Sequence, residues 1–341
     1  METMKVVAIT EVRKAELVEK PIPKPKEDWA LVKILSAPMC TEYKSWLNPG
    51  RLPIEGMGHE AAGEVVEVAQ PCKVEVSDRV VVQPGTHACG ECSLCLSGWY
   101  IHCQSSKYRG FVKNYGTYTQ YIAAPSWVLS PIPNDVSIDH ASLAVCGLGP
   151  TFNALKYMNL NAFDTVLITG FGPVGIGGLI NAKYLGARVI VVEKTAWRRE
   201  KAKELGADLV LNPADEDVLK RIMEFTDSVG VDCAVECAGD SVEAERLCID
   251  ATRRRGKVSF VGECSEDFAI RVSPDLIRKG LTLYGSWHYN LADYPDMLKV
   301  IRNSPLIDKH ITHTFPLTRI QEAMETRASL ETGKVILKPW E

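Results

Sequence analysis

Four cysteines within one short segment have the spacing of a metal site. Cys89, Cys92, Cys95 and Cys103 follow the pattern C-x2-C-x2-C-x7-C. Three thiolates at intervals of three residues can surround one ion from a single tight loop, and the fourth returns from the next turn. Four sulfur ligands leave no open position, which is typical of a structural, tetrahedral zinc site. An iron–sulfur cluster is the nearest alternative, because such clusters also use closely spaced cysteines.

A second group of residues could form an open metal site. Cys40 lies in SAPMCTEYK, His59 lies in GMGHEAAGEV directly before Glu60, and Cys146 lies in LAVCGLG. A thiolate, an imidazole and one more protein ligand, with water in the fourth position, make the coordination shell of a catalytic zinc. Taken singly, a cysteine or histidine of this kind is more often a core-packing residue than a metal ligand.

A glycine-rich turn in the middle of the chain has the features of a dinucleotide site. Gly170, Gly172 and Gly175, with Pro173 between them, form G-x-G-x-x-G at the end of the apolar run TVLIT. The glycines permit a tight turn and close backbone approach, and the N-terminus of the following helix meets the pyrophosphate. Glu193 ends the next apolar run. Its carboxylate is expected to bind the ribose and repel a 2′-phosphate, which favours NAD over NADP.

Two regions of different secondary structure must position these residues. Short apolar or alternating runs bounded by turn residues fill the first 145 or so positions and predict a compact antiparallel β domain; they are 6–10, 30–37, 61–69 and 78–84. Further along, apolar strands alternate with helical segments, which predicts a parallel sheet covered on both faces. We expect an α/β chain with a β-rich domain formed by 1–147 and 288–341 and a doubly wound Rossmann domain at 148–287.

The bulk composition excludes several classes of function. With 341 residues, 46% of them apolar, and a formal charge of −4, the chain gives no electrostatic reason to expect a nucleic-acid partner. No apolar run approaches the roughly 20 residues that cross a bilayer, and no signal-peptide pattern opens the chain. We therefore predict a cytosolic location. In that reducing compartment, eleven cysteines point to metal binding rather than to disulfides.

Together these features resemble the zinc-containing medium-chain alcohol dehydrogenase family, in which they occur in the same order. The order is Cys40, the triplet Gly58-His59-Glu60, the four-cysteine segment and Cys146. The resemblance covers essentially the whole chain, and the length is similar to that of the polyol and threonine dehydrogenase branch. It implies a GroES-like catalytic domain, one catalytic and one structural zinc per chain, and hydride transfer between a secondary alcohol and NAD, with zinc acting as a Lewis acid.

The resemblance also assigns roles to residues of the open site. Cys40, His59 and Cys146 would be ligands, and Glu60 would orient a ligand or occasionally replace one. We expect Cys146 to be the resting ligand, because it precedes Gly-Leu-Gly-Pro-Thr and the N-terminus of a helix there would favour its thiolate. Glu60 remains the competing candidate.

The chain departs from the family where a hydroxyl normally passes the alcohol proton towards solvent. That hydroxyl lies two residues after the first zinc cysteine, and here the position is Glu42. Three arrangements could replace it: the carboxylate takes the proton, Thr41 serves after a local backbone shift, or a water does. Alternatively, Glu42 is a solvated loop residue without a role.

Further cofactor contacts follow from the resemblance alone. The residue matching Arg198 lies over the adenine side in threonine dehydrogenases, and the basic neighbours Lys194 and Arg199 leave room for some use of NADP. The residues expected along the nicotinamide half are Val174, Val261, Gly262, Ser286 and Trp287.

The expected substrate is a small polar alcohol or its ketone, such as a polyol, a sugar derivative or a hydroxy acid, handled by a homo-oligomer (dimer or tetramer). One alternative is an NADPH-dependent reductase of the same superfamily, but such relatives lack the zinc ligands. Another is a dinucleotide-binding protein without enzymatic activity, which the open metal site argues against.

Overall fold

The computed structural model describes residues 2–85, 88–105, 107, 109–215 and 217–341, which form two compact units. The first contains Met1–Cys146, Asn290–Asn303 and Ile311–Glu341, and the second contains Gly147–Tyr289 and Ser304–His310. The expected first domain was 1–147 with 288–341, whereas Gly147, residues 288–289 and Ser304–His310 belong to the second unit. In that unit, His310 Nε2 lies 2.9 Å from the carbonyl oxygen of Pro173.

The first unit is built on antiparallel strands, as expected. Its strands are β1 (Thr3–Glu11), β2 (Lys14–Pro21), β3 (Trp29–Met39), β4 (Ile54–Glu55), β5 (Ala61–Val68), β6 (Arg79–Val82), β7 (Tyr121–Pro125), β8 (Leu129–Pro131), β15 (Ile311–Pro316) and β16 (Lys334–Lys338). One sheet has the order β2-β1-β4, and a seven-stranded sheet has the order β15-β16-β3-β5-β6-β8, with β7 also paired to β3. Only the β15–β16 pair is parallel among the described strands of these sheets.

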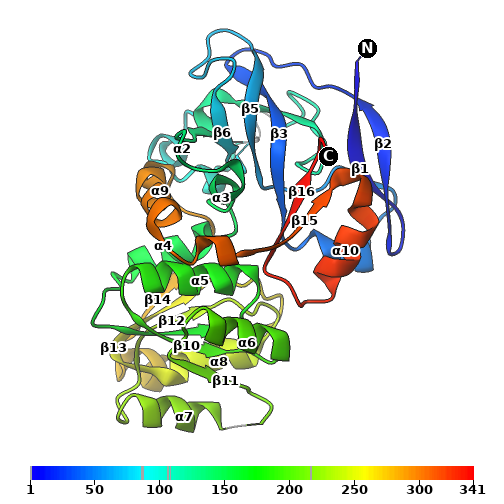
Figure 1. Cartoon of the computed structure of the whole chain (residues 1–341). Helices are drawn as coiled ribbons and strands as arrows, with labels where there is room; N and C mark the ends of the chain where they lie inside the picture. The colour runs from blue at the N-terminus through cyan, green and yellow to red at the C-terminus, as the bar shows by residue number, and fades with distance from the viewer. Residues whose placement is uncertain (1, 86–87, 106, 108, 216) are drawn as a thin grey trace. The chain divides into compact units, whose positions relative to one another are not determined.

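Five helices accompany these strands in the described residues: α1 (Glu42–Leu47), α2 (Ser93–Leu96), α3 (Ile138–Ser142), α9 (Tyr294–Asn303) and α10 (Ile320–Ala328). The core is formed where alternating side chains of the strands meet the apolar face of α10, for example Val32, Ile34, Val65, Leu337 and Met324. Figure 1 shows β16, in red, beside β3, in blue, although the two come from opposite ends of the chain.

The second unit is a doubly wound α/β sheet, which confirms the expected Rossmann fold. Its elements are α4 (Gly149–Tyr157), β9 (Thr165–Thr169), α5 (Pro173–Tyr184), β10 (Arg188–Val192), α6 (Ala196–Glu204), β11 (Leu209–Leu211), α7 (Val218–Phe225), β12 (Val231–Glu236), α8 (Val242–Ala251), β13 (Thr252–Phe260) and β14 (Thr282–Gly285). The strand order is β11-β10-β9-β12-β13-β14, and every pair is parallel. Helices α4 and α5 lie on one face and α7 and α8 on the other (Figure 1).

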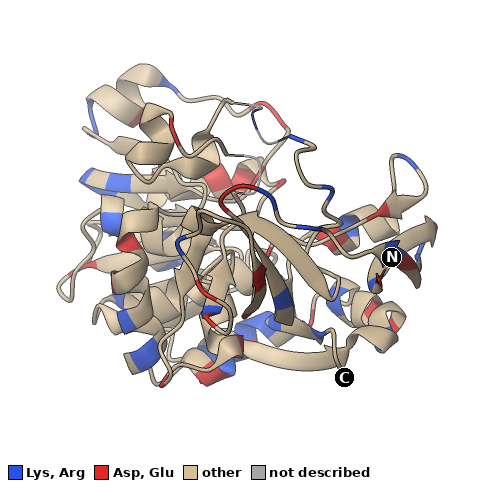
Figure 2. Cartoon of the chain, turned by 90° about the horizontal axis from the view of Figure 1, so that it is seen from above, with Lys and Arg blue, Asp and Glu red and all other residues tan. Residues whose placement is uncertain are grey.

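The order of the strands reverses between β9 and β12, so their carboxyl ends form the switch point at which such sheets bind ligands. Charges of both signs are interspersed along the ribbon, as Figure 2 shows. Among the described residues, no helix is both long and apolar enough to span a membrane.

Candidate metal and cofactor sites

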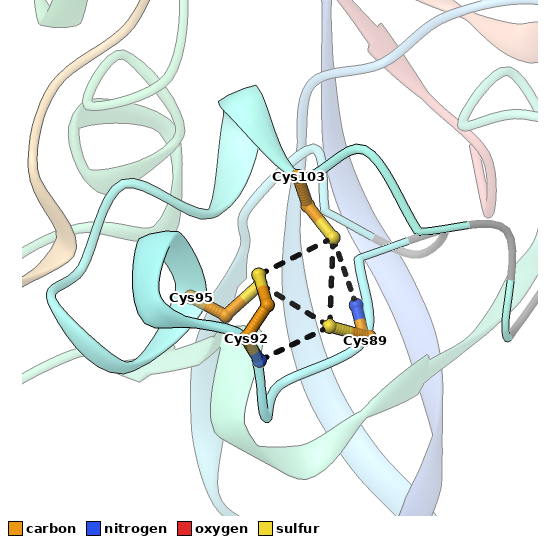
Figure 3. Close-up of side chains that lie close together, drawn as sticks. All are labelled: Cys89, Cys92, Cys95 and Cys103. Atoms are coloured by element: carbon orange, nitrogen blue, oxygen red, sulfur yellow. Dashed lines mark hydrogen bonds between the residues drawn. The ribbon is translucent and has the colours of Figure 1, made fainter.

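The four-cysteine segment folds around a single point, as the spacing predicts. Figure 3 shows the four side chains converging, with sulfur–sulfur distances of 3.6 Å (Cys89–Cys103) and 3.9 Å (Cys89–Cys95 and Cys92–Cys103). A tetrahedron of sulfurs about 2.3 Å from a zinc ion has edges of about 3.8 Å. In a cluster of two or more irons the four cysteines are divided among the irons, so some pairs of sulfurs would lie farther apart than the 4.8 Å within which all four lie here. The geometry therefore fits one ion.

Backbone groups of the same loop support these thiolates. The amide of Cys92 donates to Cys89 Sγ at 3.3 Å, and the amide of Cys89 donates to Cys103 Sγ at 3.4 Å. Burial opposes ionisation of Cys89, but the backbone amides of Glu91 and Cys92 and the neighbouring thiols lower its pKa to about 6. Four sulfurs close this site, so it can hold a metal but has no position for a substrate.

The second site is assembled by the register of three strands. Strand β3 ends at Met39, directly before Cys40, and pairs antiparallel with β5, which begins directly after Glu60. It also pairs antiparallel with β16, which begins at Lys334. The end of β3 therefore meets the starts of β5 and β16, and residues 40, 59, 60 and 334 come together at one edge of the sheet.

Cys146 joins this edge and completes a group of four possible ligands. The ligand atoms of Cys40, His59, Glu60 and Cys146 all lie within 4.8 Å of one another, and His59 Nε2 is 3.1 Å from Cys146 Sγ. Cys146 lies before α4, which begins only at Gly149, so it does not open that helix as the sequence analysis supposed. Its backbone amide instead donates to Glu60 Oε2 at 3.1 Å.

Both carboxylate oxygens of Glu60 have polar partners. Its Oε1 forms an ion pair with Lys334, and both side chains are completely buried. Burial raises the pKa of Glu60 to about 7, although the charge of Lys334 opposes this shift. Lys334 Nζ also lies 3.5 Å from the carbonyl oxygen of Met39. With these partners, Glu60 braces the ligand edge of the sheet while its own oxygens are engaged.

Glu42 contacts the Nδ1 side of the His59 ring, opposite the Nε2 that lies near Cys146. Its Oε1 is 2.7 Å from His59 Nδ1, and its Oε2 accepts hydrogen bonds from the Tyr118 hydroxyl (2.7 Å) and the Cys40 amide (2.9 Å). Burial opposes ionisation, but His59 and Tyr118 lower the pKa of Glu42 to about 2. The solvated-loop alternative is therefore wrong. A carboxylate on the far nitrogen of a ligand imidazole fixes its tautomer and orientation, and this geometry gives Glu42 that position.

Thr41 is exposed at the N-cap of α1, and its side chain makes no capping hydrogen bond. Its carbonyl oxygen accepts from the Lys44 amide at 2.9 Å, which begins the short helix. The structure thus leaves the Thr41 hydroxyl at the surface beside Cys40.

The charges around the second site fit a divalent cation. Two thiolates (Cys40 and Cys146) and two carboxylates (Glu42 and Glu60) would contribute four negative charges when a metal is bound. Two buried cations face them: Lys334 pairs with Glu60, and Arg327 Nε donates to the carbonyl oxygen of Cys40 at 3.0 Å. A doubly charged ion brings the sum to zero, and sulfur with imidazole is a donor set that zinc prefers.

The glycine-rich turn follows β9 and requires its glycines. Gly170 has φ +77°, and a Cβ there would lie 2.4 Å from the Cα of Ala238. A Cβ on Gly175 would lie 2.1 Å from the carbonyl oxygen of Gly170. Gly172 is the N-cap residue of α5 (Pro173–Tyr184). Val174 lies half-buried in the first turn of this helix.

Glu193 lies directly after β10 and is 4% exposed. Its oxygens accept hydrogen bonds from the amides of Phe171 and Thr195, both at 2.7 Å. Arg198 Nη1 lies 3.6 Å from Glu193 Oε2, and a Cβ added to Gly172 would lie 3.7 Å from the same Nη1. Glu193, expected to repel a 2′-phosphate, and Arg198, expected near the adenine side of the cofactor, therefore form a pair at the glycine-rich turn.

Glu236 joins the loops that follow β12 and β13. Its Oε1 accepts from the amides of Ala238 (2.6 Å) and Gly239 (3.0 Å), and its Oε2 accepts from the amide of Gly262 (3.2 Å). A Cβ on Gly262 would lie 2.6 Å from Glu236 Oε2, so only glycine fits. Glu236 thereby fixes the loop that contains Val261, a residue expected beside the nicotinamide.

The remaining predicted cofactor residues follow β14. Trp287 is 51% exposed, whereas Ser286 is buried. The Ser286 hydroxyl donates to the carbonyl oxygen of Pro150 and accepts from Asn153 Nδ2, both at 2.8 Å. All the predicted cofactor residues thus follow the carboxyl ends of β9, β10, β13 and β14, the edge at which doubly wound sheets bind dinucleotides.

Four residues with direct contacts to these sites were missing from the sequence predictions: Tyr118, Glu236, Arg327 and Lys334. Lys334 carried a signal, because a lysine at the start of the apolar run KVILKP needs a buried partner. Nothing in the sequence around Tyr118 or Arg327 indicated which distant residue each would contact.

Comparisons with known proteins identify the family to which the chain belongs. Residues 26–134 match the alcohol dehydrogenase GroES-like domain, and residues 173–303 match the zinc-binding dehydrogenase domain. L-threonine 3-dehydrogenase of Pyrococcus furiosus is 36% identical, with 97% of this chain and 98% of the relative covered. Sorbitol dehydrogenase of Bacillus subtilis is 29% identical, with 99% and 98% covered.

Among solved structures, an alcohol dehydrogenase of Thermotoga maritima has a TM-score of 0.83 and 28% identity, with 99% of this chain and 100% of the other covered. The two rival interpretations, a reductase without zinc and a protein without enzymatic activity, do not fit these relatives or the two ligand clusters. The chain belongs to the zinc-dependent medium-chain alcohol dehydrogenase family, among the threonine and polyol dehydrogenases, and is an alcohol-type oxidoreductase that uses zinc and a nicotinamide dinucleotide.

Proposed function

We propose that this dehydrogenase oxidises a polar secondary alcohol at a catalytic zinc held by Cys40, His59 and Cys146. The observation that carries the proposal is the convergence of two thiols and one imidazole within 4.8 Å, with Glu42 on the far side of the imidazole. The closed four-cysteine site elsewhere in the same unit accounts for the structural metal, which leaves this one for chemistry.

A zinc ion at this position would supply Lewis-acid chemistry that lowers the pKa of an alcohol hydroxyl. The protein residues have distinct tasks around it. Glu42 holds the proton on His59 Nδ1, so that Nε2 is free to act as a ligand. Glu60 is a neighbour rather than a resting ligand in this proposal, because Lys334 and the Cys146 amide occupy its oxygens.

Release of the alcohol proton requires a group other than Glu42, whose oxygens are engaged with His59, Tyr118 and Cys40. We assign the first step to the exposed hydroxyl of Thr41 or to a water beside it. A Thr41→Val variant should bind zinc normally and oxidise the alcohol more slowly, by roughly 10²-fold if the hydroxyl alone carries the proton. An unchanged rate would assign the step to water.

We propose NAD as the preferred cofactor. Glu193 places a buried carboxylate at the end of β10, where a 2′-phosphate would meet like charge. Arg198 offsets part of that charge, so some use of NADP is expected. Steady-state kinetics with both cofactors test this. A catalytic efficiency that favours NADP by about tenfold or more would mean that Arg198 decides the preference.

The substrate class is tested by NAD reduction with a panel of alcohols. L-threonine and sorbitol come first because relatives that act on them are similar over nearly the full chain. Other polyols and sugar acids follow, with a long-chain apolar alcohol as the contrast. Zinc-loaded enzyme that oxidised only the apolar alcohol would overturn the polar-substrate proposal.

We also propose a homo-oligomer, either dimer or tetramer. Strand β14 lies at the end of the sheet order and pairs only with β13 among the described strands. Val272 and Ile277, in the segment that precedes β14 in the sequence, are 61% and 71% exposed. An unpaired strand edge and exposed apolar side chains are both suited to contact with a second copy. Sedimentation should give a mass well above the 37.7 kDa of one chain. A monomer at micromolar concentration would refute this.

A cytosolic location remains our proposal as well. All eleven cysteines are free thiols in the structure, and six of them are needed as thiolate ligands in the two proposed sites. Cell fractionation with thiol labelling should find the protein reduced in the cytosolic fraction.

A further inference from the structure

Arg327 is a buried arginine at the end of the C-terminal helix α10, far along the chain from the metal ligands. It is only 4% exposed. An isolated buried charge is costly, so a guanidinium kept in such a place normally has specific partners. Its partners here belong to the segment that begins with the ligand Cys40.

Two contacts join Arg327 to this segment. Arg327 Nε donates to the carbonyl oxygen of Cys40 at 3.0 Å across a sequence separation of 287 residues. The guanidinium carbon lies 4.5 Å from the centre of the Tyr43 ring, within the range of a cation–π contact. Arg327 Nη1 is buried and has no hydrogen-bond partner among the described residues. The contact with Cys40 is therefore the principal polar compensation for burying this side chain.

The backbone of Cys40 is consequently held on both sides. Its amide donates to Glu42 Oε2 at 2.9 Å, while its carbonyl oxygen accepts from Arg327. The same carboxylate lies against His59 Nδ1. A rotation of the peptide at residue 40 would move the thiol of Cys40 and, through Glu42, the imidazole of His59. One hydrogen bond from α10 thus restrains two of the three proposed zinc ligands.

Arg327 also contributes charge. Lys334 neutralises Glu60 directly, and Arg327 is the second buried cation next to the ligand cluster. Arg327 contacts the backbone of the segment that contains Cys40 and Glu42. At this short range its positive charge stabilises the Cys40 thiolate and the Glu42 carboxylate.

We propose that Arg327 is a positioning residue for the catalytic metal: it fixes the Cys40–Glu42 turn and thereby sets the geometry of the Cys40 and His59 ligands. The inference rests on the proposed zinc site. It predicts that loss of the Arg327 contact weakens metal binding at this site alone, although the four-cysteine site belongs to the same folded unit.

The test compares Arg327→Met, which keeps an unbranched apolar stem but removes the charge and the donors, with Arg327→Lys, which keeps a charge and N–H donors but not the planar guanidinium. Arg319→Met is the matched control, because this arginine precedes the same helix but is 55% exposed and paired with Glu322. Zinc per chain is measured after dialysis against a chelator at a concentration that leaves the unaltered enzyme with both ions. The visible spectrum of cobalt substituted at the catalytic site is recorded in parallel.

We expect Arg327→Met to bind the catalytic zinc about 10–100-fold more weakly, to retain one zinc per chain and to show an altered cobalt spectrum. Arg327→Lys should be intermediate, and Arg319→Met should match the unaltered enzyme. Should Arg327→Met fail to fold, Tyr43→Leu removes the stacking partner and should shift the cobalt spectrum in the same direction by less.

Two results would overturn the inference: an Arg327→Met enzyme with both metals and an unchanged cobalt spectrum, or one that loses both metals together, which would indicate general destabilisation. The proposed function fails in a different way. In that case the unaltered enzyme itself would bind only one zinc per chain.

Discussion

The two metal sites of the first unit are built in opposite ways. The four-cysteine site takes all its ligands from residues 89–103 and is supported by amides of the same loop. The second site draws its four possible ligands from residues 40, 59, 60 and 146, and it contacts Lys334 and Arg327 near the end of the chain. The first depends on the local conformation of one loop. The second depends on the register of β3, β5 and β16, and therefore on the whole unit.

This difference matters for what each metal does. A loop that closes on itself with four sulfurs stabilises structure and excludes substrate. A site assembled from several strand ends can leave one coordination position open while distant residues fix the others. We therefore expect the stabilising metal in the loop of residues 89–103 and the catalytic metal in a site that forms only once the whole unit has folded.

The largest effect that would separate the two sites is expected for Cys146→Ala. This variant should lose the catalytic zinc and its dehydrogenase activity while the four-cysteine site stays loaded, giving about one zinc per chain instead of two. Elemental analysis of the purified variant measures this directly. If Cys146→Ala kept both metals and Glu60→Ala lost one, the roles of Cys146 and Glu60 would be reversed.

Cys103→Ser tests the opposite site and should act on stability more than on chemistry. Removing one of four thiolates leaves a coordination position unfilled and one end of the loop unpinned. A loss of about 2 kcal/mol would lower the Tm by roughly 4–8 °C. Thermal unfolding and the kcat of the folded fraction are the measurements. Full metal content together with an unchanged Tm would contradict the four-cysteine assignment.

Glu42→Gln separates orientation of His59 from proton transfer. If Glu42 orients the imidazole, the variant should bind the catalytic zinc or turn over about 10–100-fold less well, because an amide cannot serve as the negative partner of His59 Nδ1. A Tyr118→Phe variant, which removes one partner of the same carboxylate, should show a smaller loss. Unchanged zinc binding with slower oxidation mainly below neutral pH would instead support a proton-accepting role.

The smallest effect is expected for Leu96→Ser, a control inside the four-cysteine segment. Leu96 directly follows Cys95, is the last residue of α2 and is 74% exposed. An exposed substitution that leaves the sulfurs in place should change the free energy of unfolding by no more than about 0.5 kcal/mol and leave the zinc content unaltered. A large loss of zinc would mean that apolar contacts, and not the cysteine spacing, form this site.

The same contrast explains what could be predicted from the sequence. The four-cysteine site and the glycine-rich turn are local sequence patterns. In the structure the four cysteines converge, and the turn lies between β9 and α5. The strands and helices of both units were predictable for the same reason, because apolar periodicity is a property of short segments.

Contacts across the sheet were not predictable in this way. The partner of Glu60 lies 274 residues away and the partner of the Cys40 carbonyl lies 287 residues away, so each pairing follows from the topology. Glu42 shows that a position in the sequence does not by itself give the direction of a side chain. Glu42 occupies the sequence position of the expected hydroxyl, but its carboxylate, on the first turn of α1, lies against His59 Nδ1.

The carboxylate of Glu236 has a consequence for the exchange of parts between related enzymes. It holds the amides of Ala238 and Gly239 in one loop and of Gly262 in another, and leaves no room for a side chain on Gly262. A chimera keeps these hydrogen bonds only if the grafted loop places its backbone amides as Ala238, Gly239 and Gly262 do and has no side chain at position 262. Exchange of both loops together with Glu236 keeps the carboxylate and its donors matched.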